Sequence, residues 1–126
     1  MKLDGFGIFV KDMPTMVRFY RDVLEFEIKE DENAGNVYLE KDGTLFLLYG
    51  RTDFEKLTGC KFNYADNING HYEIALSVEN PEAVDKTFEK VVKKGAVPVM
   101  KPITTEWGQY TCYISDPEGN LIEITA

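Results

Sequence analysis

The feature of this sequence that most constrains its fold is an internal repeat, in which a strand pattern leads directly into a capped helix. The first copy is the alternating segment 5–10, followed by Asp12 as a helix N-cap. The second copy is the segment 72–79, followed by the N-cap Asn80 and by Pro81 at the first helical position. Asp12 and Asn80 lie 68 positions apart, so the sequence predicts two halves with the same local order of elements.

Each predicted helix is followed by three further strand patterns. In the first half these strands are expected at residues 26–29, 36–40 and 45–49. In the second half they are expected at residues 97–100, 110–115 and 121–125, and the prolines near the first of these make it an edge or irregular strand. Each half therefore has the order strand, helix, strand, strand, strand.

These patterns predict an α+β fold made of two tandem βαβββ modules. Module 1 covers about residues 1–50 and module 2 about residues 71–126, within a single domain of 126 residues. The polar segment 51–70 is expected to be a linker, in which a capping-box pattern from Thr52 to Glu55 predicts a short helix. The sequence leaves open whether the two modules pair within one chain or exchange between chains.

Charge and hydropathy exclude several classes of partner. The formal net charge is −8, which repels phosphate backbones and anionic membrane surfaces and argues against nucleic-acid binding. No apolar run approaches the roughly 20 residues that a membrane helix needs, and the first residues lack the apolar core of a signal peptide. Cys60 and Cys112 are expected to be free thiols, so we expect a cytoplasmic protein.

Several segments resemble one known superfamily when taken together and in order. They are 70–78 (GHYEIALSV), 106–108 (EWG), 116–124 (DPEGNLIEI) and 19–26 (FYRDVLEF), in which Glu25 replaces the usual glycine. On these motifs the chain resembles the glyoxalase, bleomycin-resistance and extradiol-dioxygenase proteins, the vicinal oxygen chelate superfamily. The resemblance implies a cupped mixed β-sheet with helices on its outer face and a small molecule bound inside the cup.

The resemblance also implies four positions for metal ligands, at one place on the first and the last strand of each half. Carried over by motif, these positions fall on Gly5, Leu47, Glu73 and Glu123. Gly5 and Leu47 offer no ligand atom, so half of the set is missing and we expect neither a tightly bound metal nor another cofactor. A weakly held divalent metal would use Glu73 and Glu123, with His71 as a supplement.

Without a metal, Glu73 and Glu123 are the candidate catalytic residues. Strand alternation places both in the cup, where desolvation and mutual repulsion would favour the neutral form of one of them. Such a pair suits a cationic or hydroxyl-bearing ligand, or a general base for proton abstraction. The alternative is that both lie at a solvent-exposed rim and have no role.

Aromatic residues are the other candidates for the ligand site. Alternation from Gly5 and Leu47 predicts that Phe9 and Tyr49 point into the cup, and the only tryptophan, Trp107, precedes the strand at 110–115. Tyr110 and Tyr113 differ in parity, so only one of them can face the ligand. We include Tyr110 with Phe9, Tyr49 and Trp107 among the expected ligand contacts, against the alternative of plain packing.

The function that these features favour is the binding or sequestering of an organic ligand in a cleft without a tight metal. An alternative from another class is a lyase, isomerase or dioxygenase-type enzyme with a weak or atypical divalent-metal site, so the sequence leaves open whether the protein is an enzyme. A third is an assembly or regulatory module that has kept only the fold. A homodimer is expected, because two-fold pairing closes surfaces that a heterologous association leaves open.

Overall fold

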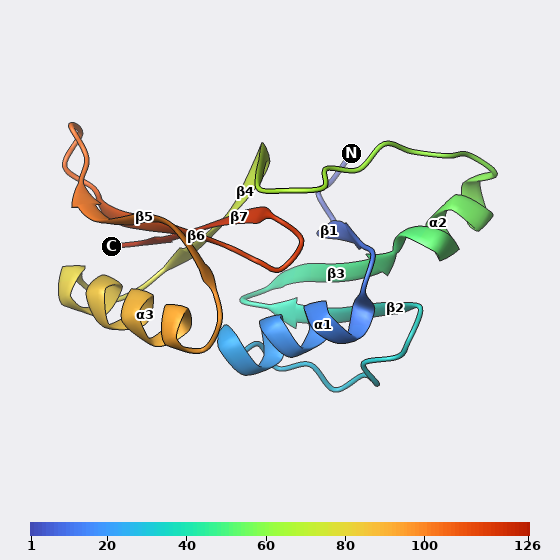
Figure 1. Cartoon of the computed structure of the whole chain (residues 1–126), viewed down its shortest axis with the longest axis horizontal. Coiled ribbons are helices and arrows are strands. Elements are labelled where there is room, and N and C mark those ends of the chain that lie inside the picture. Colours follow the sequence, from blue (N-terminus) through green and yellow to red (C-terminus); the bar gives the residue numbers. More distant parts are fainter. The chain divides into compact units, whose positions relative to one another are not determined.

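Each half of the chain forms its own sheet with a helix packed on one face (Figure 1). The computed structural model describes residues 1–126. It divides into a first unit, Met1–Tyr64, and a second unit, Ala65–Ala126. This is a mixed α+β fold with one sheet of three strands and one of four, as expected for tandem βαβββ modules. The segment 51–70, expected to be a linker, is divided between the two units.

The first unit is built around a three-stranded sheet with the strand order β1-β3-β2, in which β1 is parallel and β2 antiparallel to β3. Its elements are β1 (Gly5–Val10), α1 (Met13–Arg18), the π-helix η1 (Phe19–Val23), β2 (Asn36–Lys41), β3 (Thr44–Gly50) and α2 (Arg51–Thr58).

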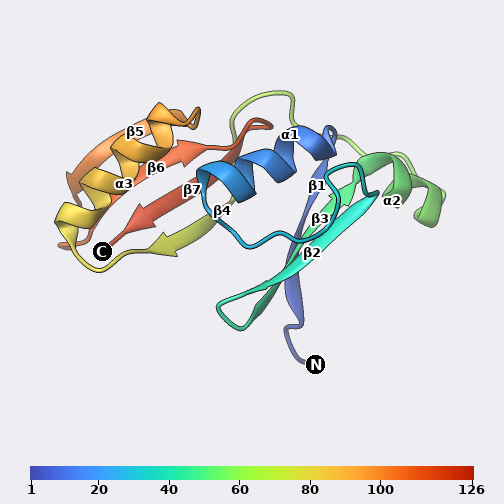
Figure 2. The same cartoon turned by 90° about the horizontal axis from the view of Figure 1, so that it is seen from below.

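The second unit contains a four-stranded sheet with the order β4-β7-β6-β5. Its elements are β4 (Asn69–Ser77), α3 (Pro81–Lys93), β5 (Val97–Thr104), β6 (Tyr110–Ser115) and β7 (Asn120–Thr125). Here β4 is parallel to β7, and the other neighbours are antiparallel. Figure 2 shows α3 lying along one face of this sheet. The two units therefore share the same parallel pairing of their first and last strands.

Both predicted helix caps are present. The Asp12 carboxylate accepts a hydrogen bond from the backbone N–H of Thr15 at 3.0 Å, and this bond lowers the pKa of Asp12. The Asn80 side chain accepts from the N–H of Ala83 at 2.9 Å. These bonds satisfy backbone donors that the first turn of a helix leaves unpaired, so the repeat fixes where α1 and α3 begin.

The core of each unit lies between its sheet and its helix. In the first unit the alternate residues of the strands are buried on the α1 side, together with the face of α1 and η1; they include Ile8, Val10, Val37, Leu48, Met16, Val17 and Tyr20. In the second unit the corresponding buried residues are Cys112, Ile114, Ile122, Ile124, Val84 and Val91. This alternation fixes which side chains of each strand point away from the helix.

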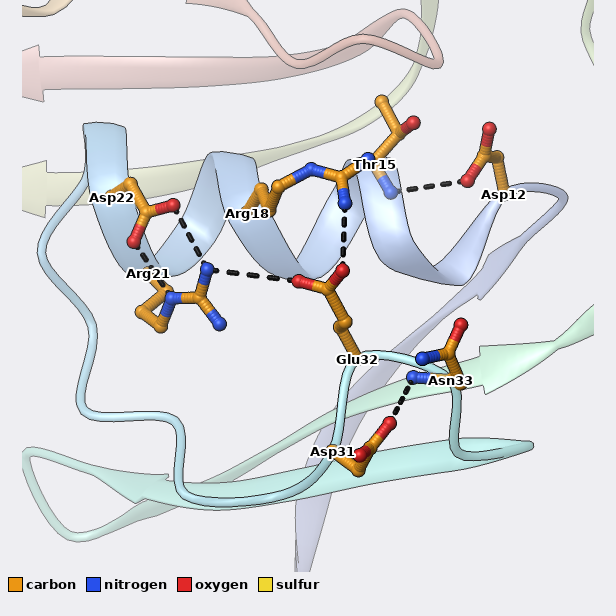
Figure 3. A network of polar contacts seen from close by, with 8 residues as sticks. All are labelled: Asp12, Thr15, Arg18, Arg21, Asp22, Asp31, Glu32 and Asn33. Atoms are coloured by element: carbon orange, nitrogen blue, oxygen red, sulfur yellow. Dashed lines mark hydrogen bonds and ion pairs between the residues drawn. The ribbon is translucent and has the colours of Figure 1, made fainter.

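The strand expected at residues 26–29 does not form. Phe26 and Ile28 are buried and the residues between and after them are exposed, as in an edge strand, but the segment joins no ladder. The chain enters it through Glu25, whose φ of 61° is in the left-handed region where glycine is usual. After residue 29 the chain turns towards α1 and η1, where Glu32 contacts Arg18 at 2.7 Å and Arg21 at 3.7 Å (Figure 3).

The helix predicted between the halves is present as α2, but its start differs from the prediction. Its N-cap is Gly50, with no side-chain capping bond, so the capping box from Thr52 to Glu55 does not form. The helix begins one residue before Thr52 because it continues directly from β3. None of the helices combines the length and apolar character that crossing a membrane requires.

Candidate functional site

The face of the second sheet that points away from α3, which we call the distal face, carries both predicted carboxylates. Tyr113 on β6 pairs with Glu123 on β7 in the antiparallel ladder, and side chains of such a pair lie on the same face. The Tyr113 hydroxyl also contacts Glu73 of β4. Glu73 and Glu123 therefore lie on one face around Tyr113, as strand alternation predicts for the two carboxylates.

Tyr113 connects the two carboxylates. Its hydroxyl donates a hydrogen bond to Oε2 of Glu73 at 2.7 Å. Burial, the hydrogen bond to Glu73 and the nearby charge of Glu123 all raise the pKa of the Tyr113 phenol far above its usual value. The phenol therefore stays protonated and acts as a hydrogen-bond donor between two acidic groups.

Glu123 is the least accessible charged group of the site, with 8% of its surface exposed. Its Oε1 accepts hydrogen bonds from the Thr111 hydroxyl at 2.9 Å and from Nε2 of Gln109 at 3.3 Å. No Lys or Arg side chain of the same unit forms an ion pair with it. Neutral donors alone stabilise a charge that is nearly removed from solvent, which leaves the carboxylate able to attract a cation.

Gln109 extends this network to Trp107. The indole Nε1 of Trp107 donates to Oε1 of Gln109 at 2.9 Å, and Nε2 of Gln109 also donates to the Thr125 hydroxyl at 2.6 Å. The Trp107 side chain is 77% exposed, so this end of the network lies in solvent. Sequence reasoning missed Gln109 and Thr111, although Thr111 lies two residues before Tyr113 on β6 and Gln109 lies two residues before Thr111, just ahead of the strand, a spacing that puts side chains on one face.

Tyr110, which we included among the expected ligand contacts, lies on the opposite face of the sheet. Its hydroxyl donates to the carboxylate of Asp85 on α3 at 2.9 Å, and this bond raises the pKa of Tyr110. Tyr110 has the same parity as Cys112, which is fully buried on the α3 side. Of the two tyrosines, Tyr113 is the one beside the carboxylates.

His71 is not brought together with Glu73 and Glu123 as a third potential ligand. No group of three His, Cys, Asp or Glu side chains in the unit has the geometry to hold a metal ion. The ladder between β4 and β7 shifts register between Asn69 and Glu73, and such an irregularity interrupts strand alternation. A spacing of two residues therefore does not put His71 beside Glu73.

Phe9 and Tyr49 lie together in the first unit, on the face of its sheet away from α1. Their ring centroids are 6.3 Å apart, and Phe54 of α2 stacks on Phe9 at 4.2 Å. Phe9 remains 40% exposed. Phe54 was not among the predicted site residues, because its contact with β1 depends on how α2 folds back. That Phe9 and Tyr49 contact a ligand stays a prediction.

The residues at the four implied metal positions do not fit a metal centre. Leu47 pairs with Gly7 in the first unit as Glu123 pairs with Ala75 in the second, so the ladder registers support the assignment of equivalent positions. Gly5 and Leu47 have no donor atom, and the phenol of Tyr113 is hydrogen-bonded to one of the two remaining carboxylates. Divalent metals need several oxygen, nitrogen or thiolate ligands, and no reaction step through a metal follows from these residues.

Comparison with known proteins gives a consistent family match. The model of the Glyoxalase/Bleomycin resistance protein/Dioxygenase superfamily matches residues 2–124. The uncharacterized protein YraH of Bacillus subtilis (strain 168) is 31% identical over 127 aligned residues, which cover 98% of this chain and 97% of YraH.

Solved structures show the same fold. A glyoxalase/bleomycin resistance protein/dioxygenase family enzyme from Burkholderia phytofirmans PsJN has a TM-score of 0.83 at 24% identity, over 99% of this chain and 98% of its own. A lactoylglutathione lyase from Agrobacterium tumefaciens has a TM-score of 0.74 at 19% identity, over 98% of this chain and 92% of its own. At these identities the likeness extends to the fold alone.

Proposed function

Because this chain belongs to the glyoxalase/bleomycin resistance protein/dioxygenase superfamily, we propose that it binds and sequesters a small organic molecule against the distal face of its second sheet, without a tightly held metal. Membership alone does not separate binding proteins from enzymes. The observation that carries the proposal is Glu123, a nearly buried carboxylate held by neutral donors. A few convergent polar groups of this kind fix the orientation of ligands in protein sites.

An apolar strip borders this polar network. The ladder between β5 and β6 pairs Met100 with Tyr113 and Ile103 with Thr111, so both apolar side chains lie on the distal face. Ile103 is 46% exposed. A ligand with an apolar body gains roughly 25 cal/mol for each Å² of apolar surface that it buries, which supports binding beside the carboxylates.

The use of the hydrogen-bond donors favours binding over catalysis. Proton abstraction next to a carbonyl needs donors aimed at the oxyanion that develops. Here Thr111 and Gln109 donate to Glu123, and Tyr113 donates to Glu73. Each of these donors is already used by a carboxylate, so the network stabilises negative charge of the protein itself.

Titration with a panel of small neutral aromatic and alkyl compounds tests this proposal. Trp107 is the only tryptophan, and its link to Glu123 through Gln109 makes its fluorescence a reporter of the site. We expect some of these compounds to shift the Trp107 emission of the wild-type protein and to bind the Ile103→Asn variant several-fold more weakly than the wild type. The matched control is Leu57→Asn, which changes an exposed apolar residue of α2. Binding that is equal in both variants, or no binding at all, contradicts the proposal.

Elemental analysis of the purified protein tests the second part of the proposal. We expect no stoichiometric transition metal after dialysis, because two of the four implied ligand positions are Gly5 and Leu47. About one equivalent of zinc, nickel, manganese or iron would contradict this expectation. That result would favour the alternative of a lyase, isomerase or dioxygenase-type enzyme, with Glu73 and Glu123 as the first ligands to replace.

A further inference from the structure

The distal face carries two carboxylates whose side-chain contacts in the second unit are all with uncharged groups. Glu73 and Glu123 both contact the neutral phenol of Tyr113, and the other donors to Glu123 are an amide and a hydroxyl. No Lys or Arg of the second unit pairs with either carboxylate. Two like charges that share neutral partners repel each other, and a cation between them removes that repulsion.

Several acceptor atoms of the site receive no hydrogen bond. Tyr113 donates to Oε2 of Glu73, and no hydrogen bond reaches Oε1 of that carboxylate. Thr111 and Gln109 both donate to Oε1 of Glu123. The phenolic oxygen of Tyr113 gives its proton to Glu73 and keeps lone pairs that accept. The site therefore offers acceptors, and a ligand that binds there must bring donors.

From these contacts we infer that Glu73, Tyr113 and Glu123 recognise a protonated amine, with the apolar body of the same molecule on Met100 and Ile103. This inference rests on the proposed function and specifies its ligand class. An ammonium group brings both the charge and the N–H donors that the acceptors need, and charge-assisted hydrogen bonds of this type are about twice as strong as neutral ones. The net charge of −8 favours the approach of cations.

A divalent metal satisfies this arrangement less well than an amine. Two carboxylates leave most of the coordination sphere of a divalent ion to water, and a neutral phenol that donates to Glu73 is not a metal ligand. An ammonium needs no further protein ligand, because three acceptors match its donors. Tyr113 is then the residue that sets specificity, since its hydroxyl lies beside both carboxylates and offers its own oxygen to the amine.

Three probes with the same aromatic body separate charge from hydrogen bonding: benzylammonium, benzyltrimethylammonium and benzyl alcohol. They are titrated into the full chain by calorimetry and Trp107 fluorescence, at about 0.01 M ionic strength, where screening is weak. We expect benzylammonium to bind at least about tenfold more tightly than benzyl alcohol, which corresponds to about 1.4 kcal/mol. Benzyltrimethylammonium, which has the charge but no N–H donor, should bind more weakly than benzylammonium.

Two double variants test whether Glu73 and Glu123 cause the preference for benzylammonium over benzyl alcohol. In the double variant Glu73→Gln, Glu123→Gln the affinity for benzylammonium should fall to that for benzyl alcohol. The control Glu79→Gln, Glu89→Gln removes the same charge from exposed residues beyond the end of β4 and on α3 and should keep the preference. If the double variant does not fold, Glu73→Gln alone, at an exposed position, should lower benzylammonium affinity at least about tenfold, the expectation for one lost hydrogen bond to a charged group.

Each remaining outcome decides between the inference and the proposed function. Equal affinities of the wild-type protein for benzylammonium and benzyl alcohol overturn the amine inference and leave the proposed function standing. Binding of neither probe, at concentrations where other neutral compounds of the panel bind, overturns the inference alone. A loss in the control variant as large as in the site variant also overturns it, because the preference would then come from the overall charge.

Discussion

Glu73 and Glu123 are the same residue type on one face of one sheet, and their positions give them different environments. Glu123 lies on β7, which has a neighbouring strand on each side, whereas Glu73 lies on the edge strand β4. The central position surrounds Glu123 with donors and leaves 8% of it exposed. Glu73 is exposed and has Tyr113 as its hydrogen-bond partner. Position in the sheet therefore separates a fixed carboxylate from an accessible one.

Gly119 is required in the turn before β7 by both its backbone conformation and its surroundings. Its φ is +89°, and an added Cβ would lie 2.3 Å from the carbonyl oxygen of Asn67. We expect Gly119→Ala to lower the free energy of unfolding by more than about 2 kcal/mol. Gly108 is the matched control, since its φ is +91° but no atom lies within 4 Å of the added Cβ.

Gly108→Ala should lower the free energy of unfolding by only about 1 kcal/mol, the contribution of the left-handed conformation alone. Urea denaturation of the two variants and the wild-type protein measures both values. Equal losses in the two variants would show that the contact with Asn67 relaxes when a methyl group is added.

The two cysteines should differ in reactivity. Cys112 is fully buried, and burial raises the pKa of its thiol to about 11. Only the thiolate reacts with disulfide reagents, so at pH 8 roughly one Cys112 thiol in a thousand is in the reactive form. Cys60 is exposed. We expect Ellman's reagent to titrate one thiol in the folded protein and two in denaturant, and Cys60→Ser to abolish the reaction of the folded protein.

The helices are held in different ways. α3 has 13 residues, is capped by Asn80 and buries Val84 and Val91 against its sheet. α2 has 8 residues and none of them is buried; it contacts the sheet through Phe54, which packs on Phe9 and Tyr49, and through a hydrogen bond from Arg51 to the carbonyl oxygen of Phe9. Helix stability in proteins comes mostly from packing of an apolar face, so α3 contributes to the fold of its unit and α2 is a peripheral element.

Removal of the cap of α3 should destabilise the protein measurably. Asn80→Ala loses the bond to the N–H of Ala83, which is 2.9 Å long, and we expect a loss of about 1 kcal/mol in the free energy of unfolding. Asn80→Asp, which keeps an acceptor at the same place, should change the stability little. Thermal or urea denaturation measures the difference. A loss below a few tenths of a kcal/mol for Asn80→Ala would mean that water replaces the cap.

At the scale of the whole chain, the two units share one strand topology, but the sheet of the first unit has one strand fewer. In both, the first strand is parallel to the last, and the equivalent pairs Gly7 with Leu47 and Ala75 with Glu123 occupy the same place in the ladder. The second unit has four strands and the first has three, because residues 26–29 join no ladder. The polar network described above lies entirely in the second unit.

We predict that the protein is a homodimer in solution. Each sheet has two edge strands, and several large apolar side chains are exposed, among them Phe9, Tyr38, Ile103 and Trp107. Two-fold association covers the same surface on both copies and leaves no open end. Light scattering coupled to size-exclusion chromatography should give about 29 kDa, twice the 14.4 kDa of one chain. A mass of one chain at micromolar concentration would refute the dimer.

What the sequence by itself determined is the part of the fold that depends on near neighbours. The caps Asp12 and Asn80 act on backbone groups three residues away, so the residue type and its place before an apolar face were sufficient to predict them. Strand alternation likewise placed Glu73 and Glu123 on one face, because the direction of a side chain in a strand changes with every residue.

Only the tertiary structure decided which partners those residues have. Alternation shows that Tyr110 and Tyr113 point to opposite faces of the sheet. The position of α3 determines which face is covered, and the Tyr110 hydroxyl donates a hydrogen bond to Asp85 of that helix. The bond from Tyr113 to Glu73 joins residues 40 positions apart, and residues 26–29 stay outside the sheet although their own pattern is that of a strand. Contacts between distant residues depend on the packing of whole elements, because a local pattern specifies a conformation and not the surface against which it lies.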